Sequence, residues 1–158
     1  MQPEIATWVE DVALFWEAQG LPRIAGRILG WLMICEPPHR TPAQLAEELG
    51  ASKSSISTMT RLLEASGTIE RVAVPGERAS YFALTPEGLE RKFTVRVAAM
   101  TGFVALADAG LALAPGATAR LEVVRAMYAF IEREMPALLE RWQAERAQLV
   151  SGKGGGWS

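Results

Sequence analysis

The fold of this chain is decided by residues 41–84, TPAQLAEELGASKSSISTMTRLLEASGTIERVAVPGERASYFAL. Residues 41–44 supply an N-cap threonine, a proline at the first helical position and a capping-box glutamine, which together start a short helix. Gly50 ends that helix, and Ser52 caps a second one over residues 53–66. Two short helices joined by so few residues have the length of a helix-turn-helix.

The second half of the same stretch has the composition of a β-hairpin. Residues 68–74 and 79–84 are rich in valine, isoleucine, tyrosine and phenylalanine, and the turn-forming Pro75-Gly76-Glu77-Arg78 separates them. Two strands alone are marginally stable, so they must pack against the helices that precede them. The order helix, helix, hairpin predicts a winged helix-turn-helix.

Helices are expected on both sides of this unit. Residues 4–19 place apolar side chains at spacings of three and four, which predicts an amphipathic helix. Residues 22–36 predict a helix that is apolar on most sides and therefore central, and its Gly26 and Gly30 would let another helix approach closely. Behind the hairpin we expect one long helix from Thr85-Pro86 toward residue 114.

A turn at Pro115-Gly116 and a last helix over residues 117–150 complete the expected helices, with Pro136 as a potential kink. The apolar stripes of the first helix and of the two C-terminal helices exceed what one small domain can bury, which predicts a homodimer. We expect a mostly α-helical chain with a small β-hairpin. We therefore divide the chain into four expected segments: N-terminal helices for dimerisation and core (1–36), the winged helix-turn-helix DNA-binding region (37–85), C-terminal dimerisation helices (86–150) and a flexible tail (151–158).

Composition and charge exclude several classes of protein. The chain has 158 residues and 49% hydrophobic residues, as expected for one soluble domain. Charged residues and glycines interrupt its longest apolar stretch, residues 95–114, so we expect no membrane span, and the first residues lack the pattern of a signal peptide. Cys35 is the only cysteine, so a cytoplasmic location is expected. The net charge of −2 does not by itself indicate a nucleic-acid partner.

The sequence contains no pattern typical of an enzyme. His39 is the sole histidine and lies in a proline-rich turn without a cysteine or histidine partner, which predicts a surface residue and no metal site. Glycine-rich phosphate loops, nucleophile elbows and paired carboxylates are missing from the sequence, so we expect neither catalysis nor a cofactor. Cys35 could be a redox sensor, but its place at the end of an apolar helix favours a buried, inert thiol.

The helix over residues 53–66 has two dissimilar faces. Ile56, Met59, Leu62 and Leu63 form the expected buried stripe. The other face carries short hydroxyl side chains and two cations, which suit phosphates and base edges in a major groove. A solvated, serine-rich surface is the alternative, but the helix before it and the hairpin after it favour DNA. The DNA-binding residues expected here are Ser52, Lys53, Ser54, Ser57, Thr58 and Arg61.

Three arginines outside this helix are further candidates. Arg78, at the hairpin tip, could enter a minor groove, where a narrow A·T-rich channel concentrates negative potential. Arg23 and Arg27 could clamp phosphates beside the major groove, or pair with Glu17 or with carboxylates of a partner subunit. Residues 52–78 contain four cations and three carboxylates, net +1, which predicts modest non-specific affinity and a shallow salt dependence.

Several motifs resemble one protein family when taken in order. They are GLPRIAGRILG (20–30), LAEELG (45–50), SSIS (54–57), IERV (69–72) and PGERASYF (75–82), and as a set they resemble the GbsR-type branch of the MarR regulators. The adjacent Glu77-Arg78 pair follows the GbsR-type variant of the wing. The resemblance implies a homodimer intertwined through its terminal helices, with helix 53–66 in the major groove and the Arg78 wing in the minor groove of a pseudo-palindrome.

Some GbsR-type members respond to choline-like compounds, which an aromatic cage would bind. The aromatic residues that could form such an effector pocket are Trp8, Phe15, Trp16, Trp31 and Phe103. The same side chains are what the core of a helical dimer needs, and we favour that interpretation. We expect a transcription regulator that binds double-stranded DNA sequence-specifically. It would be a homodimeric repressor whose repression a small-molecule effector could relieve. The alternative is a winged-helix protein–protein interaction module without a DNA target.

Overall fold

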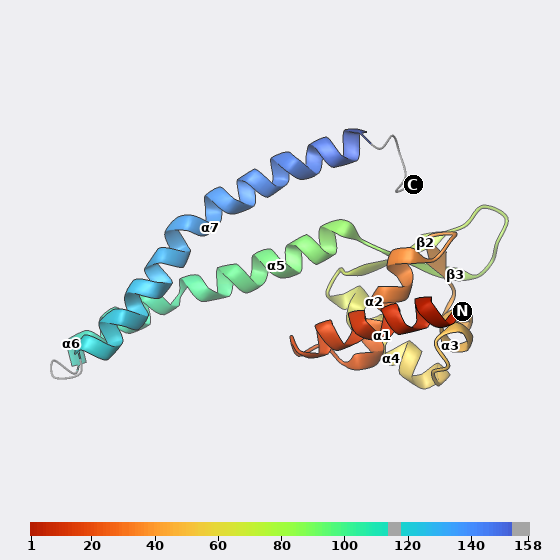
Figure 1. The fold of residues 1–158 in the computed structure, drawn as a ribbon, viewed down its shortest axis with the longest axis horizontal. Coiled ribbons are helices and arrows are strands. Elements are labelled where there is room, and N and C mark those ends of the chain that lie inside the picture. The colour runs from red at the N-terminus through yellow and green to blue at the C-terminus, as the bar shows by residue number, and fades with distance from the viewer. Residues whose placement is uncertain (114–117, 153–158) are drawn as a thin grey trace. The chain divides into compact units, whose positions relative to one another are not determined.

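The winged helix-turn-helix expected from the sequence is present in the computed structural model, which describes residues 1–113 and 118–152 (Figure 1). The elements in chain order are α1 (Pro3–Glu17), α2 (Arg23–Ile34), β1 (His39–Arg40), α3 (Pro42–Glu48), α4 (Lys53–Ala65), β2 (Ile69–Ala73), β3 (Ser80–Leu84), α5 (Pro86–Thr101), α6 (Phe103–Leu113) and α7 (Thr118–Gly152). They divide into two compact units, Met1–Lys92 and Phe93–Ser158.

The wing is a three-stranded antiparallel sheet in the order β1-β3-β2. The predicted hairpin is confirmed, because β2 and β3 pair from Ile69 opposite Leu84 to Ala73 opposite Ser80. Strand β1 pairs with the other edge of β3 and was not predicted, since two residues are too few to show an alternating pattern. His39, expected in a surface turn, is therefore a strand residue, half-buried with its ring edge-on to Tyr81 at 4.9 Å.

The core of the first unit is built around α2, as its apolar sequence predicts. Its fully buried large side chains come from five elements and include Val9, Ile28, Leu29, Leu45, Leu49, Ile56, Leu63 and Ile69. Helix α1 crosses α2 at the two expected glycines. A Cβ at Gly26 would lie 2.8 Å from Ala13 Cα, and a Cβ at Gly30 would lie 3.2 Å from Val12 Cβ.

The crossing of α1 and α2 leads to a stability prediction for Gly26→Ala. The added methyl would press on the backbone of α1, which cannot rotate away as a side chain could, so the helices must separate. We expect the free energy of unfolding to fall by about 2 kcal/mol, measured by urea denaturation at one protein concentration. Gly102→Ala is the matched control, because nothing lies within 4 Å of its Cβ position. Equal effects of the two substitutions would contradict this packing.

The second unit is helical. The expected single helix toward residue 114 is interrupted at Gly102, which separates α5 from α6, and α7 continues through Pro136 as far as Gly152. Asp108 and Arg125 form an ion pair between α6 and α7, and the rings of Phe103 and Tyr128 pack at 4.4 Å. The expected turn at Pro115-Gly116 and residues 153–158 of the expected tail lie outside the described residues. Within the described part, no helix is long and apolar enough to cross a membrane.

Candidate nucleic-acid interface

The N-terminus of α4 carries a cluster of serine hydroxyls. Ser52 is the N-cap, and its Oγ accepts the backbone N–H of Ser55 at 3.1 Å. The same Oγ lies 3.0 Å from Ser54 Oγ and 3.1 Å from Ser55 Oγ. Ser52 therefore starts the helix, while Ser54 is exposed beside a first helical turn whose N–H groups favour anions.

One side of α4 is buried and the opposite side is an exposed polar face. The structure places all the expected contact residues of this helix on the exposed side: Lys53, Ser54, Ser57, Thr58 and Arg61. We call these five residues the reading face. The Nε of Arg61 donates to the carbonyl oxygen of Ser57 at 3.1 Å, so its guanidinium lies along the helix.

The buried stripe of α4 differs from the predicted one at one position. Leu62, predicted to be buried, is 43% exposed, and Thr60 is buried in its place. Thr60 lies one turn after Ile56 and one turn before Leu63, so it shares their face. Its hydroxyl donates to the carbonyl oxygen of Ile56 at 2.9 Å, which satisfies the buried polar group within the helix.

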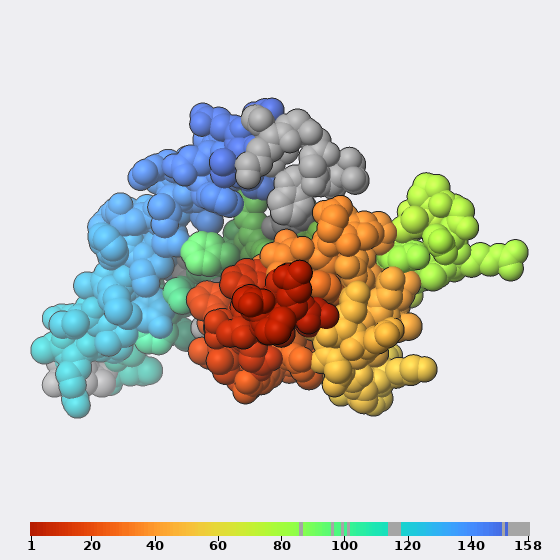
Figure 2. Space-filling view, turned by 45° about the vertical axis from the view of Figure 1, so that its right-hand side comes forward, coloured from red at the N-terminus to blue at the C-terminus, as the bar shows by residue number. Residues whose placement is uncertain are grey.

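The tip of the wing is exposed and reaches away from the helices of the first unit (Figure 2). The backbone turns at Gly76, whose φ of 86° favours glycine, and the N–H of Glu77 donates to the carbonyl oxygen of Val74 at 3.0 Å. Arg78 follows directly on this turn and is exposed. A narrow, projecting turn that carries an exposed arginine can insert this side chain into a groove of DNA.

Arg71, at the base of the wing, is used within the fold. Its guanidinium donates to the Glu64 carboxylate, with Nε 2.7 Å from Oε1, and lies over the Phe82 ring at 5.3 Å. This pair raises the pKa of Arg71 through the hydrogen bond to Glu64 and ties the wing to α4. By contrast, Lys53, Arg61 and Arg78 form no ion pair with any residue that the structure describes. These three cations are therefore available to phosphates.

Arg23 and Arg27, one turn apart at the start of α2, face carboxylates of α1. Arg23 is ion-paired with Glu10 and lies 3.9 Å from Glu17. Arg27 Nε lies 3.2 Å from the second oxygen of Glu10, and its Nη2 donates to the carbonyl oxygen of Leu49 at 2.7 Å. Arg27 thus supports the turn of the helix-turn-helix. The side chain of Arg23 is 47% exposed, and its partners among the described residues are the carboxylates of Glu10 and Glu17.

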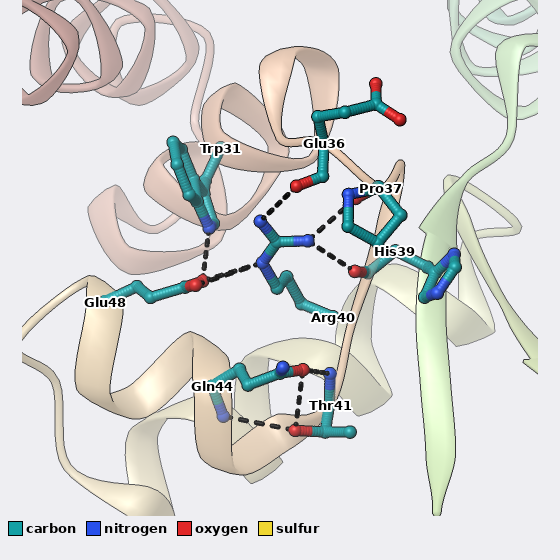
Figure 3. Close-up of polar contacts among 8 residues, drawn as sticks. All are labelled: Trp31, Glu36, Pro37, His39, Arg40, Thr41, Gln44 and Glu48. Carbon is teal, nitrogen blue, oxygen red and sulfur yellow. Dashed lines mark hydrogen bonds and ion pairs between the residues drawn. The ribbon is translucent and has the colours of Figure 1, made fainter. Parts of the chain in front are cut away.

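A buried arginine that sequence reasoning missed positions the first helix of the motif. Arg40 in β1 is 8% exposed, and its guanidinium donates to Glu48 at the end of α3 and to the backbone carbonyl oxygens of Glu36, Pro37 and His39 (Figure 3). The Glu48 carboxylate also accepts the indole N–H of Trp31 from α2 at 2.6 Å. The network therefore joins α2, α3 and β1.

The opposite end of α3 is fixed by the predicted capping box (Figure 3). Thr41 Oγ1 accepts the backbone N–H of Gln44 at 3.2 Å, and Gln44 Oε1 accepts the backbone N–H of Thr41 at 2.8 Å. With Glu48 held by Arg40 and the Leu49 carbonyl by Arg27, both ends of α3 are fixed. The turn into α4, with φ of 58° at Gly50, therefore starts from a rigid support.

The aromatic residues considered for an effector pocket have different surroundings. Trp31 is buried, and Arg40 lies over its ring at 5.5 Å. Trp16 packs partly against the core and meets the 61% exposed Phe15 edge-on at 5.4 Å. Trp8 is 41% exposed, and Phe103 belongs to the second unit, where it packs on Tyr128. Trp31 thus belongs to the core of the first unit, while Phe15 and Trp8 present apolar surface.

Cys35 caps the C-terminus of α2 and is 4% exposed. Burial raises the pKa of its thiol, only partly opposed by the charge of Arg40. Since the thiolate is the reactive form, we expect the native protein to react with a disulfide reagent far more slowly than the urea-unfolded chain at a pH of about 8. The absorbance of the released thiolate measures both rates. Equal rates would support the redox-sensor interpretation.

Among the described residues, no three histidine, cysteine, aspartate or glutamate side chains lie together as a metal site would require. The arrangement instead resembles known regulators. The family model described as MarR family matches residues 19–80, and the model described as MmpR5-like MarR family transcriptional regulator matches residues 87–145.

Two individual proteins are similar to this chain over most of its length, in agreement with the two family matches. The HTH-type transcriptional regulator MmpR5 of Mycobacterium tuberculosis is 39% identical over 145 residues, which cover 89% of this chain and 88% of that protein. A crystal structure described as a transcriptional regulator is 37% identical, with a TM-score of 0.67, over 90% of this chain and 99% of the other. The similarity therefore extends over both units.

Proposed function

Because this chain belongs to the MarR family of DNA-binding transcriptional regulators and is MmpR5-like, we propose that it is a cytoplasmic, homodimeric repressor that reads a pseudo-palindromic operator. The family is one of regulators and not of enzymes, and its members bind operator DNA. The observation that carries the proposal is the reading face. It combines exposed hydroxyls with cations that form no ion pair within the described chain, on a helix whose support is rigid.

In this proposal each contact residue has a distinct role. Ser54, Ser57 and Thr58 face base edges in the major groove, where short hydroxyls can donate or accept. Ser52, Lys53 and Arg61 bind phosphates, which set the register of the helix without reading sequence. Arg78 enters the minor groove on the wing tip, and Arg23 and Arg27 lie toward the DNA backbone beside the major groove.

The second copy is proposed from exposed apolar surface on the terminal helices. Leu14 and Phe15 of α1 are 45% and 61% exposed. Helix α7 exposes a longer set, which comprises Val123, Val124, Met127, Phe130, Leu138, Trp142 and Leu149. Large apolar side chains exposed repeatedly along a helix are typical of a protein–protein interaction surface. Dimerisation through residues 1–36 and 86–150 would bury it, and would present two reading faces about one DNA turn apart.

A small-molecule effector would act on this dimer by shifting the population between DNA-competent and incompetent separations of the two winged helices. We retain the GbsR-type branch as a proposal that rests on the motifs within residues 20–82. Under it the effector is a choline-like cation, and Trp8, Phe15, Trp16 and Phe103 are the available aromatics. Trp31 is the least suited of the five, because Glu48 and Arg40 already occupy its polar edge and its face.

The experiment is a genome-wide footprint followed by gel shifts on the enriched sites. We expect an inverted repeat whose half-sites are about 10 bp apart, and a shift that random DNA does not compete away. Arg78→Ala should weaken the shift and reduce the preference for A·T-rich flanks. The outcome that would contradict the proposal is a chain that enriches no site and shifts no duplex at low salt. A winged-helix module for protein–protein contacts would then be the better account.

A further inference from the structure

An open hollow lies between the first turn of α2 and the reading face of α4. Its volume is about 390 Å³, and α2 contributes Pro22, Arg23 and Ile24 to its lining. From α4 come Ser54, Ser55, Thr58 and Met59, so two residues of the reading face also form one wall of the hollow. The lining is thus mixed, with three apolar side chains, three hydroxyls and one cation.

We propose that this hollow seats the sugar–phosphate backbone of the DNA strand that borders the major groove, and that Arg23 exchanges Glu10 for a phosphate when DNA binds. The inference rests on the proposed function, and it deepens that function by naming how Arg23 takes part. An α-helix with its side chains is about 10–12 Å across, and the major groove is about 12 Å wide. A helix that fills the groove therefore touches the strands on its flanks.

The chemistry of the lining suits this occupant. Deoxyribose presents carbon surface, which Pro22, Ile24 and Met59 can contact. Phosphate oxygens accept hydrogen bonds from Arg23 and from the Ser55 hydroxyl, which leaves Ser54 and Thr58 to the base edges. A guanidinium and a phosphate form a charge-assisted, often bidentate pair. The hollow thus offers a donor at its edge and apolar surface within it.

The ion pairs of Arg23 allow it to change partner. Its side chain is 47% exposed, and Glu17 is 3.9 Å away with the same exposure, so these contacts are weak in water. Glu10 keeps an ion-pair partner when Arg23 leaves, because Arg27 Nε lies 3.2 Å from its other oxygen. Glu10 therefore binds Arg23 in the free protein, and a DNA phosphate must displace Glu10 to bind Arg23.

The test uses a random-sequence 30-bp duplex and fluorescence anisotropy over a range of salt concentrations, because a phosphate contact is independent of sequence. Each phosphate contact contributes about 0.9 to the salt slope, so Arg23→Gln should lower the slope by about 1.8 for a dimer and weaken binding several-fold. Glu10→Gln should tighten binding, and should have no such effect in the Arg23→Gln background.

Two matched controls separate this exchange from bulk charge. Asp11→Asn removes one carboxylate from the same helix, and Arg133→Gln removes one exposed cation from α7. Wild-type binding with an unchanged slope in Arg23→Gln would overturn the inference and leave the proposed function intact. Equal tightening by Glu10→Gln and Asp11→Asn would overturn the exchange with Glu10. Failure of the wild type to bind any duplex at low salt would overturn the proposed function itself.

Discussion

Replacing Arg40 by methionine is expected to lower the free energy of unfolding by about 3 kcal/mol. Methionine fills a similar volume but donates no hydrogen bond. Of its two partners, the Glu48 carboxylate would keep the indole N–H of Trp31, and the backbone carbonyls of Glu36, Pro37 and His39 would lose the Arg40 donor. Breaking one side of a partly buried ion pair costs more than a surface pair contributes, because the remaining Glu48 side chain is only 29% exposed and so only partly solvated.

Urea denaturation followed by circular dichroism measures this loss, at one protein concentration because the stability of the proposed dimer would depend on it. Arg133→Met is the matched control, since Arg133 is also paired with a glutamate and lies over an aromatic ring, but is 66% exposed. We expect the control to change stability by less than about 0.5 kcal/mol. Similar effects of the two substitutions would show that the Arg40 network does not hold α3.

The double substitution Ser54→Ala and Ser57→Ala is expected to reduce affinity for the footprinted site by roughly 700-fold. Each lost hydrogen bond is worth about 1 kcal/mol, and the proposed dimer loses four donors, or about 4 kcal/mol in total. Both side chains are exposed, and Ser52 remains as the N-cap, so the fold and its unfolding midpoint should not change. Anisotropy on a labelled operator duplex measures the affinity.

The matched control for the serine pair is Thr7→Ala with Ser151→Ala. Both hydroxyls are exposed on helices and donate only to carbonyl oxygens of their own helix, Thr7 to Pro3 and Ser151 to Ala147 and Gln148. Removing them deletes the same number of hydroxyls outside the proposed DNA interface. If the control weakened operator binding as much as the reading-face pair, the assignment of base contacts to α4 would be wrong.

Local signals made much of the fold predictable. The capping box at Thr41 and Gln44, the cap at Ser52 and the hairpin turn at Gly76 each involve neighbours in the sequence, and all are present. The close approach at Gly26 was also predictable, because a pair of small residues one turn apart needs a reason within a helix. Elements that depend on a few adjacent residues are the ones that can be predicted from a single sequence.

The features that were not predicted depend on contacts between distant residues. Nothing local distinguishes Arg40 from a surface arginine, since its partners Glu48 and Trp31 come from other elements. Strand β1 exists only because β3 lies beside it. Arg71, counted among the positive charges near the wing, is paired with Glu64 seven residues away. For the candidate site, exposure supports the reading face, while the role of each side chain on DNA stays a prediction.

The central claim, that α4 reads DNA sequence, is tested most directly by one measurement of specificity. Wild type and the Ser54/Ser57 double alanine variant are each titrated onto the footprinted operator and onto a scrambled duplex, at a salt concentration of about 150 mM. We expect the wild type to prefer the operator by roughly 1,000-fold or more. The variant should lose most of this preference while it keeps its affinity for scrambled DNA. An undiminished preference in the variant would contradict the claim.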